Sequence, residues 1–121
     1  MIKIRLLKKK NDGKVCEILS FDELHNYKLK KDKEFETEIL KEANDWVERS
    51  ILKIKKKIES KSLYKYNYID LSFDKSYCGG NKEYFIAEVE KIKAILTQKG
   101  YKFENLLVDP NTLIWYIRIY I

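Results

Sequence analysis

The sequence predicts a single α+β domain in which two amphipathic helices cover one face of a mixed β-sheet. Two long segments repeat apolar residues at steps of three and four, and two others alternate apolar and polar residues. The 121 residues include only four Gly and one Pro, so flexible linkers are not expected. The expected order is β-β-α-α-β-α-β-β in a two-layer sandwich spanning residues 1–121.

The amino-terminal third is expected to form a hairpin and a short helix over residues 1–33. Ile2, Ile4 and Leu6 alternate with basic residues, and the turn residues 11–13 lead to a second strand over 14–19. Ser20-Phe21-Asp22-Glu23 has the spacing of a capping box, which predicts a short helix to about Tyr27. We expect residues 28–33 to be a charged connector.

The remaining residues, 34–121, are expected to form an α-β-α-β-β core. A long helix is predicted over residues 34–60, where apolar residues recur at Phe35, Ile39, Ala43, Trp46, Val47, Ile51, Ile54 and Ile58. A strand over residues 66–74 follows. Gly80 or Asn81 is the expected N-cap of a second helix, which ends at Gly100.

The chain ends in a predicted hairpin with strands at residues 101–108 and 113–121. The turn Asp109-Pro110-Asn111-Thr112 separates them. The strands at 66–74 and 101–108 flank a helix, so we expect them to pair in parallel with a right-handed crossover. In the last strand, one face points into the core, and it consists of Leu113, Trp115, Ile117, Ile119 and Ile121, whereas Ile114 shares the other face with Tyr116, Arg118 and Tyr120.

Cysteine and histidine usage argues against several chemistries. Cys16 and Cys78 are far apart and belong to no metal-binding motif, so a zinc site has little support and two buried thiols are expected. His25 is the only imidazole, so a Ser-His or Cys-His catalytic unit would have to use it. We therefore expect no enzyme activity, no metal and no cofactor.

A metal-dependent nuclease is the least favoured alternative. Asp70 and Asp74 would project from the same face of a strand, and Asp109 follows another strand. Such carboxylates can hold Mg²⁺. However, no Glu-x-Lys element completes a nuclease site, and strand-end carboxylates more often stabilise turns.

The most distinctive candidate binding surface consists of Tyr68, Tyr116, Arg118 and Tyr120, which we call the tyrosine face. If their strands are neighbours, several rings and a cation share one side of the sheet. Tyr and Arg are enriched at protein interfaces, and aromatic platforms also stack single-stranded bases. A protein partner, nucleic acid or a second copy of the chain would fit this face. Alternatively, residues 1–33 cover it as a second small core.

Lysine supplies most of the basic residues, and these outnumber the acidic ones to give a net charge of +6. A basic patch is expected at Lys53, Lys55, Lys56, Lys57, Lys61 and Lys65. Residues 34–48 carry six acidic groups and one basic group, so the long helix is acidic first and basic later, as the helix dipole favours. The charge segregation is therefore interpreted chiefly as structural, and the lysines alone give no sequence specificity.

No segment is long and apolar enough for a membrane span, and the first residues have no signal-peptide core, so a cytoplasmic location and no membrane partner are expected.

The segments Leu96-Thr97-Gln98-Lys99-Gly100-Tyr101 and Leu113-Ile114-Trp115-Tyr116-Ile117-Arg118-Ile119 support a resemblance that extends from about Glu38 to Ile121. This region resembles a loose class of small phage and prophage accessory proteins, which includes anti-CRISPR and other anti-defence inhibitors. The resemblance implies a non-enzymatic protein that occupies a surface of a larger defence or nucleic-acid-handling machine. Direct binding of RNA or single-stranded nucleic acid is the alternative.

Overall fold

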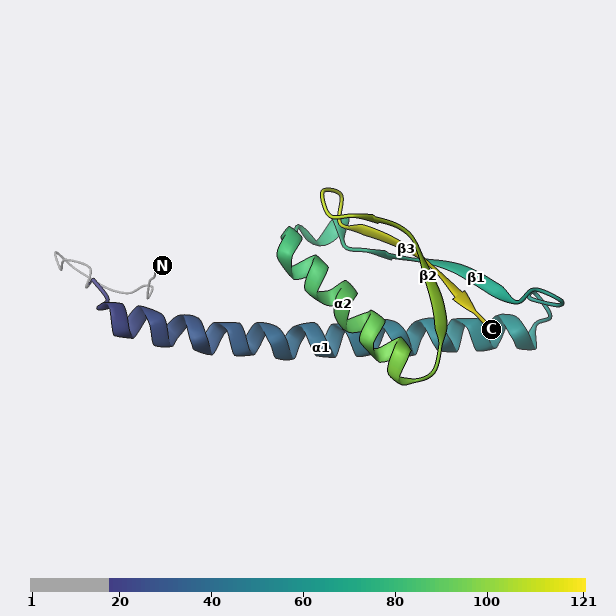
Figure 1. Ribbon diagram of the computed structural model, residues 1–121, viewed down its shortest axis with the longest axis horizontal. Helices are drawn as coiled ribbons and strands as arrows, with labels where there is room; N and C mark the ends of the chain where they lie inside the picture. The colour runs from purple at the N-terminus through teal and green to yellow at the C-terminus, as the bar shows by residue number, and fades with distance from the viewer. Residues whose placement is uncertain (1–17) are drawn as a thin grey trace. The chain divides into compact units, whose positions relative to one another are not determined.

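The computed structural model describes residues 18–121, which contain two α-helices, a short 3-10 helix and a three-stranded antiparallel sheet (Figure 1). The elements are α1 (Phe21–Glu59), β1 (Tyr68–Asp74), η1 (Ser76–Cys78), α2 (Lys82–Gln98), β2 (Lys102–Asp109) and β3 (Ile114–Tyr120). The α+β class is thereby confirmed. The hairpin expected over residues 1–19 lies outside the described residues, except for its last two, which are not in a strand.

The chain divides into two units, Met1–Glu34 and Phe35–Ile121. In the first unit, Ser20 forms the expected capping box with Glu23: the Ser20 amide donates to Glu23 Oε1 at 2.9 Å, and the Glu23 amide donates to Ser20 Oγ at 3.2 Å. The expected stop near Tyr27 is wrong, because helix α1 continues through the residues interpreted as a connector.

The continuity of α1 has a local physical cause. No Gly or Pro occurs between Phe21 and Glu59, so nothing in the backbone interrupts the helix. The charged residues of the supposed connector also pair along the helix. Lys28 Nζ lies 2.6 Å from Asp32 Oδ2 at a separation of four residues, and Lys31 Nζ lies 3.2 Å from Glu34 Oε1 at a separation of three.

The sheet of the second unit has the order β1-β3-β2, and β3 pairs antiparallel with both neighbours. The expected mixed sheet is therefore wrong, as is the parallel pairing of β1 with β2: these strands run in the same direction, but β3 lies between them. A central strand that is paired along both edges and buried on one face favours apolar residues on that face. Trp115, Ile117 and Ile119 of β3 are fully buried, so its central position protects the most apolar strand.

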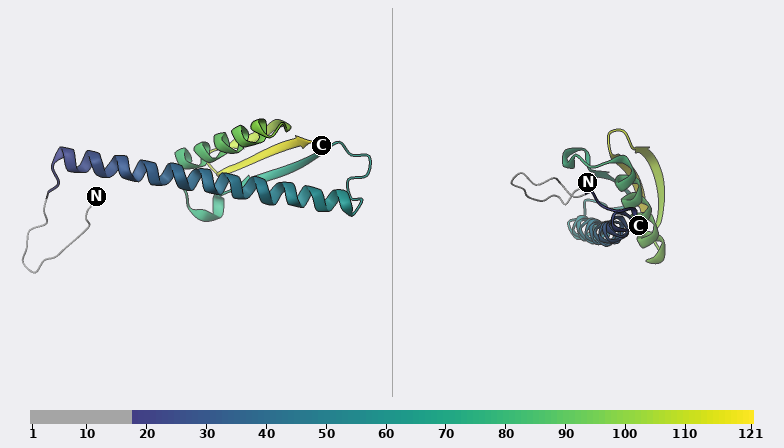
Figure 2. Two further views of the ribbon diagram at one scale, coloured as in Figure 1. Left: turned by 90° about the horizontal axis from the view of Figure 1, so that it is seen from below. Right: turned by 90° about the vertical axis from the view of Figure 1, so that its left-hand side faces the viewer.

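One face of the sheet and both helices share a single core. The Phe73 ring lies 5.8 Å from the Trp46 ring of α1 and 5.8 Å from the Phe85 ring of α2. Both helices therefore contact the same face of the sheet, and two views show them on that side (Figures 1 and 2). The core comprises Ala43, Val47, Ile54, Ile69, Phe73, Phe85, Val89, Ile92, Leu96, Leu113, Trp115, Ile117 and Ile119.

Both ends of α2 agree with the sequence prediction, whereas Cys78, which precedes this helix, does not. Asn81 is the N-cap, since its Oδ1 accepts from the Tyr84 amide at 2.7 Å, and Gly100 adopts the left-handed conformation with φ 86°. Cys78, by contrast, is exposed at the end of η1, so the expectation that it is buried is wrong. It lies in a turn after the sheet rather than within the core.

The β2–β3 hairpin forms close to its predicted bounds. Asp109 Oδ1 accepts from the amides of Asn111 and Thr112 at 3.1 Å and 3.4 Å, which fixes the turn. The β2–β3 register shifts between Asn105 and Leu107. Next to this bulge, the indole nitrogen of Trp115 donates to Asn105 Oδ1 at 2.8 Å. The largest buried side chain therefore also has its polar atom satisfied.

We expect Asn105→Ala to lower the free energy of unfolding by about 1 kcal/mol, because the Trp115 donor loses its partner. In a Trp115→Phe background the same substitution should cost much less, since that donor is gone. Urea denaturation followed by circular dichroism in a double-mutant cycle measures the difference. Equal costs in both backgrounds would show that the hydrogen bond does not contribute.

Candidate functional site

The strand register brings together all four residues of the tyrosine face. Tyr68 of β1 lies opposite Tyr120 of β3, and Arg118 lies between Tyr116 and Tyr120 on the same strand face. These positions alternate with the buried residues Ile117 and Ile119, so their side chains project from the opposite side of the sheet. Tyr116 is 43% exposed and Tyr120 is 40% exposed. Within the unit Phe35–Ile121, the tyrosine face is therefore not covered by another element, with the helices packed on the other face; the alternative that residues 1–33 cover it stays a prediction.

Arg118 is held in place by two neighbours on β1. Its Nε and Nη2 donate to the two carboxylate oxygens of Asp70 at 2.8 Å and 3.1 Å, and its guanidinium carbon lies 4.2 Å from the centre of the Tyr68 ring. The hydrogen bonds from Arg118 lower the pKa of Asp70, and the Asp70 carboxylate raises the pKa of Arg118. This bidentate and stacked arrangement fixes the orientation of the guanidinium before any partner binds.

Tyr120 is also oriented by a neighbouring strand. Its hydroxyl donates to Glu104 Oε1 of β2 at 2.9 Å, and its ring meets that of Tyr68 edge-on at 6.5 Å. The hydrogen bond to Glu104 raises the pKa of the Tyr120 hydroxyl, which keeps it protonated. The phenol is thus a fixed part of the surface.

The charges that surround the tyrosine face are mainly acidic. The register places Arg118 between Asp70 and Glu104, so both of its cross-strand neighbours are carboxylates. At the hairpin end, Asp74 and Asp109 flank Ile114. Lys102, opposite Tyr120, is the other basic residue at these paired positions. Sequence reasoning placed a cation among the rings correctly, but it missed these acidic partners because they become neighbours only through the register.

The carboxylates considered for metal binding have other partners. Asp70 binds Arg118, Asp109 holds the hairpin turn, and Asp74 Oδ1 accepts from the Ser76 amide at 2.9 Å and from the Ser76 hydroxyl at 2.6 Å. Within residues 18–121, no group of three or more His, Cys, Asp or Glu side chains is arranged to hold a metal ion.

Four residues of the basic patch belong to α1 and therefore lie on the helix side of the sheet: Lys53, Lys55, Lys56 and Lys57. Lys53, Lys56 and Lys57 line a shallow hollow on α1 together with Arg49, Leu52 and Ser60, whereas Lys55 is not among its lining residues. Lys61 and Lys65 follow α1 in the loop before β1, and both have left-handed backbones, with φ 65° and 67°. The α1 lysines and the tyrosine face thus belong to different surfaces.

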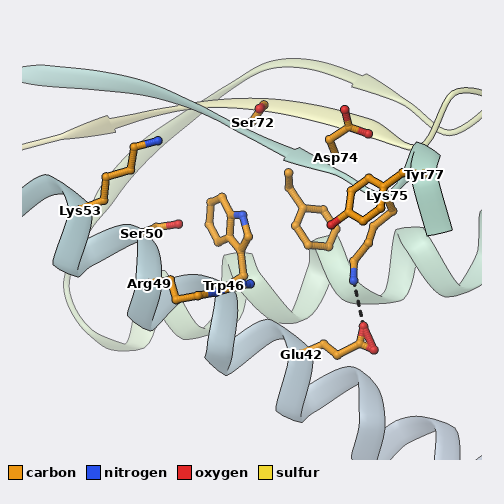
Figure 3. Close-up of a pocket in the computed structure, with 10 residues that line it drawn as sticks. Glu42, Trp46, Arg49, Ser50, Lys53, Ser72, Asp74, Lys75 and Tyr77 are labelled. Carbon is orange, nitrogen blue, oxygen red and sulfur yellow. Dashed lines mark hydrogen bonds and ion pairs between the residues drawn. The ribbon is translucent and has the colours of Figure 1, made fainter.

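A second hollow adjoins the first and lies between α1 and the end of β1 (Figure 3). The Trp46 indole extends from α1 toward the strand, and Tyr77 and Lys75 border one end of the hollow. Lys75 Nζ donates to Glu42 Oε1 at 2.9 Å across this end of the hollow. Arg49 and Lys53 line both hollows, so the two lie side by side along α1, and we call them together the α1 groove.

Sequence reasoning missed a buried carboxyl beside this groove. Glu88 of α2 is 1% exposed, and its Oε2 lies 3.4 Å from Lys75 Nζ without a hydrogen-bond partner among the described residues. Burial, together with the nearby Glu42, raises the pKa of Glu88 to about 7. The signal was present in the sequence: Glu88 lies within the apolar stripe that contains Phe85 and Ile92.

Two other groups complete this cluster. The Tyr84 hydroxyl donates to Glu38 Oε1 at 3.2 Å and to Glu42 Oε2 at 3.3 Å, while burial and these carboxylates raise its pKa. Burial opposes the charged forms of both Glu42 and Lys75, but their mutual contact prevails, so the pKa of Glu42 is lowered and that of Lys75 is raised. The cluster therefore links α1, α2 and the segment after β1.

We expect the free energy of unfolding to fall as the pH rises from about 5 to about 8, because the folded state must then lose the proton of Glu88, whose folded pKa lies above its unfolded value. The stabilisation is complete below the unfolded pKa and is lost through the folded one. Glu88→Gln should remove this loss, which is on the order of 1 to 3 kcal/mol. Urea denaturation at both pH values measures it.

The matched control is Glu83→Gln, which replaces an exposed glutamate of the same helix and should retain the wild-type pH dependence. An unchanged pH dependence in Glu88→Gln would contradict the assignment.

Comparisons of the chain with protein-family models, curated proteins and solved structures find no match. The resemblance to phage accessory proteins therefore stays a prediction based on the residues quoted above. Within residues 18–121, no helix combines the length and apolar character required to cross a lipid bilayer.

Proposed function

We propose that the protein is a non-enzymatic binding protein that docks on another protein through its tyrosine face. The observation that carries this proposal is the fixed orientation of Arg118, which binds Asp70 in bidentate fashion and lies over Tyr68. Tyr and Arg supply much of the binding energy at protein interfaces. Side chains that are already ordered lose less conformational entropy on binding, so this arrangement favours tight association.

The apolar centre of the interface lies next to this fixed arginine. Leu107 of β2 is 54% exposed and lies opposite Tyr116, and Ile114 precedes Tyr116 on the same side of β3. Charged residues border this centre, as they do in interfaces with an apolar core and a polar rim. The tyrosine face thus offers both parts of a protein-binding surface.

The charge of this surface favours a basic partner. The carboxylates of Asp70, Asp74, Glu104 and Asp109 outnumber Arg118 and Lys102 at the paired positions. Nucleic-acid phosphates would meet these carboxylates, so the tyrosine face is poorly suited to bind nucleic acid directly. A protein that handles nucleic acid exposes basic surface for the phosphates, and such a surface is complementary to this face.

The proposed action is therefore occupation of the basic surface of a nucleic-acid-handling protein. The sharpest version is an anti-defence inhibitor such as an anti-CRISPR protein, which rests on the resemblance to phage accessory proteins. In this mode of action, the chain blocks its partner by binding alone and catalyses no reaction.

We expect Tyr116→Ala/Tyr120→Ala to reduce partner binding by about 30-fold or more, because each residue belongs to the centre of the interface. Affinity capture from a nuclease-treated host lysate identifies the partner, and calorimetry with the purified partner measures the dissociation constant. Nuclease treatment removes proteins that are captured only through nucleic acid.

The matched control is Tyr64→Ala/Tyr66→Ala, which removes two exposed tyrosines from the loop between α1 and β1. It should bind like the wild type. Equal losses in the two double variants, or a partner that binds the protein as tightly after loss of Tyr116 and Tyr120, would refute the proposal. Circular dichroism of each variant verifies that it is folded.

A further inference from the structure

The geometry points to a second binding surface: the groove along α1 holds the backbone of single-stranded nucleic acid. This α1 groove consists of the two adjoining hollows that share Arg49 and Lys53. The hollows enclose about 370 Å³ and about 460 Å³. The inference goes beyond the proposed protein docking, because it uses other residues on the helix side of the sheet.

The cations of the groove follow one face of the helix. Lys53 lies four residues after Arg49, and Lys56 and Lys57 lie three and four residues after Lys53, so each cation neighbours Lys53 on the helix surface. The helix rises about 12 Å from the first to the last of them. That length matches roughly three or four nucleotide steps, at about 3.4 Å per step along a duplex strand.

These four cations have no acidic partner in the part of the chain that the structure describes. None of them forms an ion pair within residues 18–121, whereas Lys75 and Arg118 do. Arg49 Nε donates to the Asp45 carbonyl of its own helix at 3.2 Å, which does not neutralise its charge. The groove therefore presents four unneutralised positive charges to a polyanion.

The helix dipole accounts for only two of these four charges. Its effect is confined to the last turn, and the basic residues of the last turn of α1 are Lys56 and Lys57. Arg49 and Lys53 lie further from the helix end, so the dipole gives them little stabilisation. Their unpaired charge is better explained by an external anion.

Aromatic rings at one end of the groove favour a single strand over a duplex. Tyr77 is 80% exposed, and the half-buried Trp46 faces the same hollow. Unpaired bases can stack on such rings, whereas the bases of a duplex are already stacked. Of the two acidic residues of this hollow, Glu42 pairs with Lys75, whereas Asp74 is hydrogen-bonded to Ser76 and keeps one negative charge beside the four cations.

The composition of the groove predicts binding without sequence preference. Arg49 is the only arginine among its four cations, and lysine lacks the planar fork that reads base edges. Affinity should come from phosphate contacts and stacking, and should therefore fall steeply with salt.

The test uses the full chain and a fluorescein-labelled oligothymidylate of twelve nucleotides, with fluorescence anisotropy at several salt concentrations. Four phosphate contacts predict a slope of log K against log salt of about −2.8 for a single strand. Lys53→Gln/Lys56→Gln should reduce the magnitude of the slope by about 1.4 and weaken binding about 25-fold near 0.1 M salt.

The matched control is Lys82→Gln/Lys91→Gln, which removes the same charge from exposed positions on α2 and should leave the slope unchanged. Equal effects of the two double variants would overturn the proposal, because binding would then follow net charge alone. Absence of saturable binding would overturn it as well. Tighter binding to a twelve-base-pair duplex or to phosphatidylserine vesicles would also contradict the proposal, because the duplex or the lipid surface would then be the preferred ligand.

The stacking role has its own variant. Tyr77→Ala should weaken oligothymidylate binding about fivefold or more, while Tyr77→Phe should retain it because the ring is preserved. Tyr77 is exposed, so neither substitution should affect folding. Equal affinity of the alanine and phenylalanine variants would show that the ring does not contact a base.

Discussion

The alternation of side chains along β3 is the constraint on which the rest of the structure depends. Trp115, Ile117 and Ile119 are fully buried against the helices, while Tyr116, Arg118 and Tyr120 project from the opposite face. A shift of one residue in the pairing would exchange these two sets, so burial of Ile117 and Ile119 also fixes the residues of the tyrosine face. The central position of β3 then gives each outward residue a neighbour on both sides. This is why Arg118 meets Asp70 on β1 and Glu104 on β2.

The sheet and α1 separate the charges of the second unit. Carboxylates dominate the paired positions around the tyrosine face, whereas unpaired cations line the α1 groove. The net charge of +6 conceals this division, because it sums two surfaces of opposite character. A basic protein surface and a nucleic-acid strand are complementary to different surfaces of this chain. The two surfaces share Asp74, but the proposals are tested on different side chains, so each can fail without the other.

Local patterns predicted local structure well, and failed where the outcome depended on distant partners. The capping box at Ser20, the N-cap at Asn81 and the stop at Gly100 involve neighbours in the chain, and all three are confirmed. The alternation in β1 and β3 also predicted which residues share the tyrosine face. The strand order was missed, because period two does not reveal which strand lies in the centre. The Asp70 contact with Arg118 was missed for the same reason, since it arises from pairing across 48 residues.

The helix dipole explains only part of the charge segregation along α1. Dipole complementarity predicts acidic residues at the start of the helix and basic residues at its end, and α1 has both. In the acidic half, Glu38 and Glu42 accept hydrogen bonds from Tyr84, and Glu42 also binds Lys75, so tertiary contacts use these charges. In the basic half, Arg49 and Lys53 form no ion pair with another described residue, and they lie outside the last turn. One sequence pattern thus has two explanations: internal packing for the acids and, under the proposal for the α1 groove, an external anion for the cations.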